Sequence, residues 1–409
     1  MQKIILSVVA VFLLTLTNCQ SNTKTAQDTT VMTDSTGAIQ PDADTATHVD
    51  ATVYKMPESK AFEDKVAGKE AKLYTLKNKY MQVALSNYGA RIVSIMVPDK
   101  NGKIVDVAPG FDDLKKYQQP GGAFMGPVVG RFGNRIAKGK FTLDGKTYQT
   151  ELNNNGNNLH SGPTGFHSHV WDVKEADDKH LTLQYASPDG EGGFPGTVTT
   201  SVTFTLTDDN GLKLDYTATT DKATPYNPTS HGFFNLNGQG TVNNHLMMID
   251  ADKFSAVDKG LIPQGEPILV TGTPFDFRKP TTIGARINEK NEQLGFAGGY
   301  DHNFVLNKQR RSVGSTVEGM TKAIEVIGDE TGIKMDVFTT EPAVQFYGGN
   351  FFKGVDAGRT GKPIGYREAF ALETQHYPDS PNHPTYPNTI LRPGETYKQT
   401  TEYKFSTVK

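Results

Sequence analysis

The chain has 409 residues, of which 42 are Lys or Arg and 45 are Asp or Glu, so its formal net charge is −3. This near-neutral balance argues against a nucleic-acid-binding protein, which normally carries a strongly basic face. The combination of 36% hydrophobic residues with 41 Gly and 22 Pro favours a loop-rich β protein over a leucine-rich helical bundle. The single cysteine excludes an intrachain disulfide and a cysteine-rich zinc site.

Residues 1–19 have the pattern of a signal peptide. Lys3 supplies a positive charge, and residues 4–16 form an apolar run that is too short to span a membrane comfortably. Cys19, the only cysteine, follows Leu16-Thr17-Asn18 and resembles the lipidated cysteine of bacterial lipoproteins, although Asn18 replaces the usual small residue. We therefore expect an extracytoplasmic protein anchored to a bacterial membrane through a lipid on Cys19. The alternative is an ordinary signal peptide with an incidental cysteine.

Residues 20–65 are rich in Thr, Asp, Ala and Ser and poor in large apolar side chains. Such a segment cannot bury enough apolar surface to offset its loss of conformational entropy on ordering. We predict a flexible tether there, followed by one folded domain over residues 66–409.

The pattern within this domain is that of strands and turns. Apolar and polar residues alternate with period two, and the pairs Asn101-Gly102, Asp144-Gly145 and Asn210-Gly211 separate strand-like runs as hairpin turns do. Only short stretches such as residues 112–118 have a helical pattern, and no repeat of fixed period is present. We predict a large all-β antiparallel sandwich in which residues 395–405 pair back into the sheet. The clearest predicted strands are residues 80–85, 91–97, 140–148, 180–185, 199–207, 213–219 and 334–340.

Two loop-like stretches combine polar side chains with glycine. In residues 126–136, Arg131 and Arg135 are four residues apart with Asn134 between them. The planar fork of arginine suits hydroxyl and carboxylate oxygens, but a pair of arginines that only braces a loop is the alternative. In residues 153–162, His160 ends an Asn/Gly cluster typical of an irregular turn, where a solvated or structural histidine is the alternative.

Two further stretches place a titratable group beside apolar residues. His231 lies between Ser230, Gly232 and two phenylalanines, where partial burial suits an imidazole that exchanges protons near neutral pH. Glu373 lies in an apolar strand-like run, where a carboxylate is costly unless it is paired or its pKa is raised, so it is a candidate general base. A histidine at the edge of the core and a solvated glutamate are the respective alternatives. Asp301 and Gln345 are polar groups set among aromatic residues.

His167 and His169 form the remaining cluster of potential metal ligands. Two residues apart on a predicted strand, they would face the same way and could begin a metal site. No third ligand follows at a useful spacing, so we expect polar surface there and no bound metal.

These stretches, in this order, resemble the aldose 1-epimerase (galactose mutarotase) family over about residues 72–405. One such piece would be a weak signal, but eight in order are specific. The pieces are GRFGNRI (130–136), NNGNNLHSG (154–162), GFHSHVWDV (165–173), FPG (194–196), NPTSHGFFNL (227–236), GYDHNFVL (299–306), AVQFYGGN (343–350) and ALETQHYPDS (371–380).

The resemblance implies a galactose mutarotase-like β-supersandwich that acts on free aldoses without a cofactor. It implies His231 as the general acid and Glu373 as the general base. The residues that it implies as holders of sugar hydroxyls are His160, Arg135, Asp301 and Gln345, with Asn134 beside them. Ser161 stands where the family often has Gly, and Gly133 where it often has Ala, which leaves the preferred aldose open.

The implied reaction, interconversion of α and β anomers, fits this pair of residues. One group must take the proton of the anomeric hydroxyl and another must protonate the ring oxygen, and no redox, phosphate or metal step is needed. A non-catalytic sugar-binding lipoprotein on the same fold is the main alternative. An enzyme for phosphorylated hexoses would need a further cationic cluster, for which Arg131 and Arg278 are available. We expect a monomer, with Trp171 in the core and not stacked on a sugar.

Overall fold

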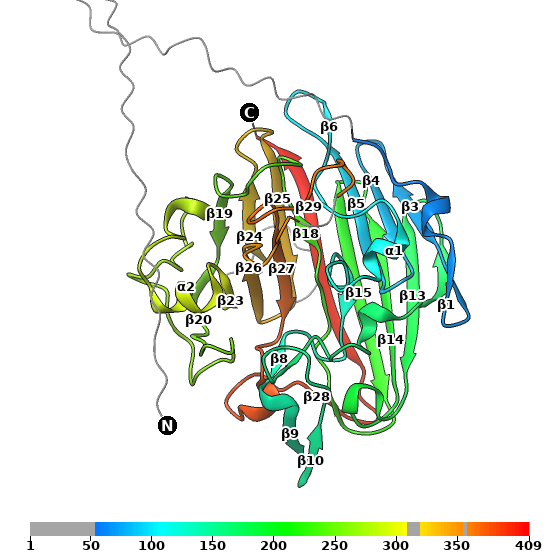
Figure 1. Cartoon of the computed structure of the whole chain (residues 1–409), viewed down its shortest axis with the longest axis vertical. Coiled ribbons are helices and arrows are strands. Elements are labelled where there is room, and N and C mark those ends of the chain that lie inside the picture. The colour runs from blue at the N-terminus through cyan, green and yellow to red at the C-terminus, as the bar shows by residue number, and fades with distance from the viewer. Residues whose placement is uncertain (1–53, 309–319, 355–357, 409) are drawn as a thin grey trace, which may run out of the picture. The chain divides into compact units, whose positions relative to one another are not determined.

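The computed structural model describes residues 54–308, 320–354 and 358–408. The predicted signal peptide, Cys19 and residues 20–53 of the predicted tether lie outside these described residues. The described residues form one compact unit. Most of its ordered elements are strands (Figure 1), and none of the helices in the described ranges is long and apolar enough to cross a bilayer. The predicted all-β antiparallel fold is thereby confirmed.

The larger layer is a nine-stranded antiparallel sheet. Burial along β14 alternates strictly, because side chains of a strand point to opposite faces in turn and one face covers the core. In spatial order the strands are β12 (Asp172–Ala176), β13 (His180–Ser187), β14 (Val198–Leu206), β15 (Gly211–Thr220), β29 (Tyr397–Thr407), β25 (Ile333–Thr339), β24 (Thr321–Ile327), β19 (Leu246–Ile249) and β22 (Thr281–Thr282).

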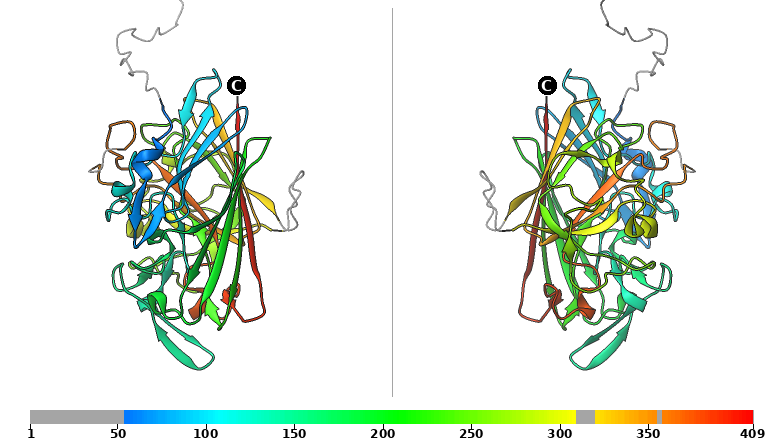
Figure 2. Two further views of the ribbon diagram at one scale, coloured as in Figure 1. Left: turned by 90° about the vertical axis from the view of Figure 1, so that its right-hand side faces the viewer. Right: turned by 90° about the vertical axis from the view of Figure 1, so that its left-hand side faces the viewer.

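A six-stranded and a four-stranded sheet pack against this layer, as the views in Figure 2 show. The six-stranded sheet has the order β18 (Phe233–Phe234), β27 (Phe370–Gln375), β26 (Ala343–Tyr347), β23 (Asp301–Leu306), β20 (Ala251–Phe254) and β21 (Ile268–Leu269). The four-stranded sheet has the order β3 (Leu73–Lys77), β4 (Gln82–Ser86), β5 (Arg91–Pro98) and β6 (Ile104–Asp106).

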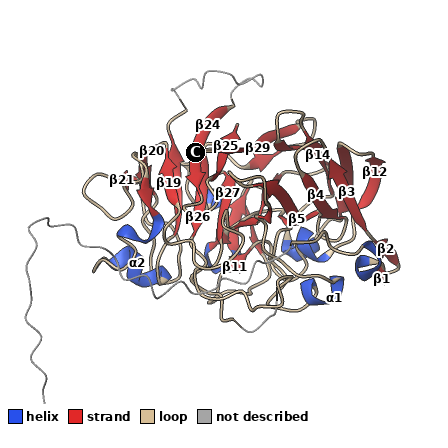
Figure 3. Ribbon diagram, turned by 90° about the horizontal axis from the view of Figure 1, so that it is seen from above, coloured by secondary structure: helices blue, strands red, loops and turns tan. Residues whose placement is uncertain are grey.

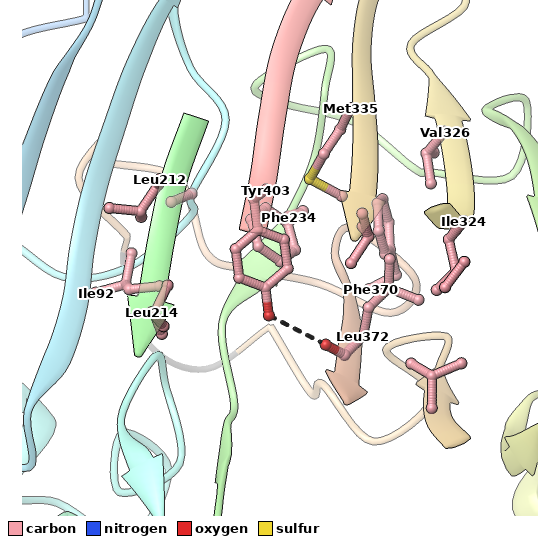
Figure 4. Close-up of a cluster of buried hydrophobic side chains, with 14 of the residues drawn as sticks. Ile92, Leu212, Leu214, Phe234, Ile324, Val326, Met335, Phe370, Leu372 and Tyr403 are labelled. Atoms are coloured by element: carbon pink, nitrogen blue, oxygen red, sulfur yellow. Dashed lines mark hydrogen bonds between the residues drawn. The ribbon is translucent and has the colours of Figure 1, made fainter. Parts of the chain in front are cut away.

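The core lies between these layers. Met335 and Tyr403 of the nine-stranded sheet lie beside Phe370 and Leu372 of β27, and Leu212 of the same sheet lies beside Ile92 of β5 (Figure 4). The hydroxyl of Tyr403 donates a hydrogen bond of 3.3 Å to the backbone carbonyl of Leu372, so this polar group is satisfied inside an apolar core. Trp171 is 1% exposed and belongs to the same core, as predicted.

The remaining described elements are two-stranded ladders and short helices outside the three larger sheets. Both α-helices lie at the periphery of the strands (Figure 3). The ladders are β1 (Asp64–Val66) with β2 (Lys69–Ala71), β7 (Val128–Val129) with β17 (Thr229–Ser230), β8 (Arg135–Ile136) with β11 (Asn158–Leu159), β9 (Lys140–Leu143) with β10 (Lys146–Gln149), and β16 (Thr224–Pro225) with β28 (Ile390–Leu391). The helices are α1 (Leu114–Tyr117), α2 (Glu292–Ala297), and the 3-10 turns η1 (Ser59–Phe62), η2 (Ala137–Gly139), η3 (Phe166–Ser168), η4 (Glu191–Gly193), η5 (Ile283–Ala285) and η6 (Ser380–Asn382).

Most local predictions agree with these elements, but residues 140–148, predicted as one strand, form the hairpin of β9 and β10. The pairs Asn101-Gly102, Asp144-Gly145 and Asn210-Gly211 connect β5 to β6, β9 to β10 and β14 to β15. Asp144 and Gly145 both have positive φ, the backbone of a tight hairpin turn. The closing run of the chain becomes β29, which pairs with β15 on one side and β25 on the other. Helix α2 is not predicted by the sequence analysis.

The predicted end of the tether at residue 65 is wrong. Residues 59–62 form η1, and Asp64–Val66 form β1, which pairs with β2. Phe62 is fully buried in a cluster with Phe111 and Tyr117. Tyr54 and Met56 of the same segment also pack against the core. These apolar side chains attach the segment to the domain, with Phe62 as the most deeply buried of them.

Replacing Phe62 tests this attachment. We expect Phe62→Ala to lower the free energy of unfolding by about 3–5 kcal/mol, as for other buried aromatic residues. Urea unfolding followed by fluorescence would measure it, with the half-exposed Tyr80→Ala as the control, for which about 0.5 kcal/mol or less is expected. A Phe62→Ala variant as stable as this control would show that residues 54–65 do not contribute to the folded domain.

Candidate active site

Strand β27 supplies the central carboxylate of the site. Phe370 and Leu372 point into the core (Figure 4). Because successive side chains of a strand alternate, Glu373 points to the opposite face of β27. There its side chain lines a cavity of about 240 Å³. Glu373 is 2% exposed, so it is a buried carboxylate and not the solvated glutamate considered as the alternative.

Three neighbouring groups form a chain beside Glu373. Gln345 of β26 lies directly opposite Glu373 in the strand register, and its Nε2 donates a 2.6 Å hydrogen bond to Oδ1 of Asp301 on β23. The other carboxylate oxygen of Asp301 lies 3.8 Å from Nη2 of Arg135. Asp301 and Arg135 line the cavity, whereas Gln345 lies behind Asp301 and is not among the lining residues. Gln345 therefore holds Asp301 in place.

The β8–β11 ladder positions His160 next to Arg135. The backbone amide of Asn134 donates to Nδ1 of His160 at 3.0 Å, and the amide of His160 donates to the carbonyl of Asn134 at 2.9 Å. His160 and Ser161 have φ of 51° and 66°, the left-handed backbone that the Asn/Gly cluster indicates as an irregular turn. Asn134 and His160 both line the cavity, so the structure brings the first two predicted stretches together.

His231 follows β17 and faces Glu373. Its backbone amide donates to the carbonyl of Pro127, and its carbonyl accepts from the amide of Gly126, so the main chain is held on both sides. Its Nε2 lies 3.6 Å from Oε1 of Glu373. His231 is 7% exposed and lines the cavity, which places the two predicted proton-transfer groups in one cavity.

Burial moves the pKa values of this pair in opposite directions. It raises the pKa of Glu373 to about 8, with a further increase from the charge of Asp301 and an opposing effect of Arg135. It lowers the pKa of His231 to about 4. Because the two groups are in proximity, they titrate as a pair that holds one exchangeable proton between about pH 4 and pH 8. Acid and base character are therefore both available near neutral pH.

The ring of His160 presents a donor to the cavity. Burial lowers its pKa well below the usual value, and the positive charges of His231 and Arg135 act in the same direction. The imidazole is therefore neutral, and because Nδ1 accepts the amide of Asn134, its proton is on Nε2. His160 can thus donate a hydrogen bond to a ligand oxygen.

The same tautomer argues against a metal at this place. Candidate ligand atoms of His160, His231 and Glu373 lie within 4.8 Å of one another, the one such group of three in the ranges that the structure describes. Coordination by His160 would require a lone pair on Nε2, and this atom carries the proton. These three residues therefore fit hydrogen bonding and proton transfer better than metal coordination.

Aromatic side chains share the cavity lining with the polar groups. They are Phe124, Phe233, Tyr347, Phe351 and Phe352. A cavity lined by both hydrogen-bonding groups and apolar rings fits a small ring compound with polar edges and apolar faces. Phe233 and Tyr347 stand inside the polar stretches that the sequence analysis selected, but no local pattern identifies Phe124 or Phe351.

The remaining candidates lie outside the cavity. Arg131 donates to Ser187 Oγ and to the carbonyls of Ser187, Pro188 and Pro195, so it is the loop-bracing arginine considered as the alternative. Arg278 forms ion pairs with Asp276 and Asp252. Neither arginine lines the cavity, so the cationic cluster needed for a phosphorylated hexose is not formed by them.

The predicted strand with His167 and His169 is also wrong. His167 lies in η3 and His169 follows it. The ring Nε2 of His169 contacts the carbonyl of Thr164 at 3.0 Å and Oε1 of Glu191 at 3.3 Å. His169 therefore has local partners of its own and does not face a shared site with His167.

Comparison with known proteins gives a consistent result. The family model described as aldose 1-epimerase matches residues 72–404. The galactose mutarotase of Bos taurus is 41% identical over 337 residues, which cover 81% of this chain and 93% of that protein. The aldose 1-epimerase of Escherichia coli (strain K12) is 38% identical over 342 residues, which cover 83% of this chain and 96% of that protein.

Solved structures are similar over the same part of the chain. The crystal structure of an aldose epimerase homologue from C. elegans has a TM-score of 0.76 at 29% identity and covers 83% of this chain and all of that chain. The galactose 1-epimerase of Lactobacillus acidophilus has a TM-score of 0.72 at 27% identity, covering 85% of this chain and 97% of that chain.

Proposed function

Because the chain belongs to the aldose 1-epimerase family, we propose that it interconverts the α and β anomers of free aldoses, with Glu373 as general base and His231 as general acid. The observation that carries this proposal is the proximity of the two side chains, 3.6 Å apart in one buried cavity. A protein that only bound sugar would not need an acid and a base there, and the family membership favours the isomerase over this alternative.

The pKa values place the shared proton mainly on Glu373, and ring opening uses the minor tautomer of the pair, in which the proton is on His231 and Glu373 is ionised. Glu373 takes the proton of the anomeric hydroxyl while His231 donates its proton to the ring oxygen, and the bond between C1 and the ring oxygen breaks to leave an open-chain aldehyde. After rotation about the C1–C2 bond, the former ring oxygen attacks the other face of C1. In this closing step His231 takes the hydroxyl proton and Glu373 returns its proton to the carbonyl oxygen. Atoms and charge balance without a cofactor.

The other polar groups would orient the sugar. Asp301 and Arg135, which contact each other, and the Nε2–H of His160 offer acceptors and donors for ring hydroxyls. Asn134 contributes through the backbone bond that sets the tautomer of His160, and Gln345 through its bond to Asp301. Orientation of a bound substrate supplies a large part of a barrier reduction in general.

Replacement of either proton-transfer group tests the proposal. We expect Glu373→Gln and His231→Asn each to lower kcat by roughly 10²–10⁴-fold, since each removes one proton transfer. Polarimetry of freshly dissolved α-D-glucose or α-D-galactose would measure this. Glu341→Gln is a matched control, because Glu341 is also a buried glutamate near a histidine, His376, but lies outside the cavity lining. A fully active Glu373→Gln variant would exclude Glu373 as the base.

The pH dependence provides a second test. Below about pH 4 both groups are protonated and no base remains, and above about pH 8 the exchangeable proton is lost and no acid remains. We therefore expect a bell-shaped profile of kcat/KM with limbs near these values, after subtraction of the uncatalysed rate. A rate that is still constant at pH 9.5 would contradict the assignment of Glu373.

We further propose that the protein is a lipoprotein held outside the cytoplasm by a lipid on Cys19, and that it acts as a monomer. The first proposal rests on the sequence of residues 1–19. Incorporation of radiolabelled palmitate during expression should occur in the parent protein and be lost in Cys19→Ala. Labelling that persists in Cys19→Ala would refute the anchor.

A further inference from the structure

Arg91, the first residue of β5, is a fully buried arginine without a carboxylate partner in the described ranges. A buried charge of this kind is costly unless its donors are satisfied. The rings of Tyr117 and Tyr88 lie 4.7 Å and 5.5 Å from its guanidinium carbon, which favours the cation.

Backbone carbonyls satisfy the guanidinium. Nη1 donates to the carbonyls of Met125 at 2.5 Å and Gly122 at 3.1 Å, and Nη2 donates to the carbonyl of Ala123 at 3.1 Å. Longer contacts of 3.4 Å reach the carbonyls of Tyr88 and His167. Three of these five carbonyls belong to residues 122–125, so Arg91 mainly holds this one loop.

The loop held by Arg91 carries Phe124 into the active site. Gly122, Ala123 and Met125, whose carbonyls Arg91 binds, surround Phe124 in sequence, and Phe124 lines the cavity. The centre of the Phe124 ring lies 4.9 Å from that of the His160 ring. It lies 6.1 Å from the centre of the His231 ring, on which it is stacked with an angle of 24° between the ring planes. Phe124 therefore contacts both histidines of the site.

The loop has little freedom to move by itself. Gly126 has a φ of +80°, and a Cβ there would lie 2.1 Å from the carbonyl oxygen of Ile92. The amide of Gly126 also donates to the carbonyl of His231 at 3.0 Å. The loop and the main chain of His231 are thus tied together on one side, while Arg91 ties the other side to β5.

We propose that Arg91 is a positioning residue of the reaction: by binding the carbonyls around Phe124, it holds this ring against His160 and His231 and so fixes both imidazoles relative to Glu373. The inference rests on the proposed function. Arg91 itself lies outside the cavity lining and touches the substrate at no step. Lysine cannot replace it, because a single ammonium group lacks the planar fork that reaches several carbonyls at once.

The test compares Arg91→Lys, Phe124→Leu and the double variant by polarimetry on α-D-glucose. We expect each single variant to lower kcat by about 10- to 100-fold, since a misplacement of about 1 Å costs on this order. If Arg91 acts through Phe124, the double variant loses no more than the worse single variant. Losses that multiply, or a wild-type kcat in either single variant, would overturn the proposal.

Arg131→Lys is the matched control, because Arg131 is also a buried arginine bound mainly by carbonyls, at residues 187–195 outside the cavity lining. It should lower stability without changing kcat. If Arg91→Lys does not fold, the kinetic constants of Phe124→Leu decide. A lower kcat with an unchanged KM supports the proposal, and an unchanged kcat or a loss confined to KM refutes it. A Glu373→Gln variant in the same series distinguishes failure of this inference from failure of the proposed function, since its loss of activity does not depend on Arg91.

Discussion

The proposed chemistry of this protein depends on a carboxylate, Glu373, that is buried without a cation of its own. Arg135 lies against Asp301, at 3.8 Å, and leaves Glu373 with His231 as its neighbour at 3.6 Å. If Arg135 paired with Glu373 instead, the carboxylate would be stabilised in its charged form and would be a weaker base. The pairing of Arg135 with Asp301 and not with Glu373 is therefore what suits Asp301 to the proposed binding role and Glu373 to the proposed proton-transfer role.

The alternation of side chains along β27 decides where this carboxylate lies. Because Phe370 and Leu372 face the core, Glu373 must face the other side of β27, where the cavity lies. The adjacent strands β26 and β23 place Gln345 and Asp301 on the same face at neighbouring positions. A sheet thus holds three polar side chains in fixed relation, while loops supply the imidazoles, which are less firmly held by regular structure.

This difference between strand and loop explains the position of Arg91 in the molecule. A loop residue such as Phe124 has no ladder of hydrogen bonds to fix it, so the carbonyls around it need donors from elsewhere. Arg91 supplies them from the end of β5, in an apolar surrounding where each hydrogen bond is stronger than in water. The histidines are in turn packed against Phe124.

Local patterns in the sequence were sufficient to predict most strands and the hairpin turns, because alternation and turn preference act over a few residues. They were also sufficient to select the polar candidates of the site, which are His231, Glu373, His160, Asn134, Asp301 and Arg135. The motifs recognised as a family resemblance supplied their roles. Tertiary structure alone decided that Arg131 braces a loop while Arg135 lines the cavity, that Gln345 stands behind Asp301, and that Phe62 belongs to the domain. These outcomes depend on which strands become neighbours in space, and residues such as Arg135, His231 and Glu373 meet only because the order of strands in the sheets differs from their order in the chain.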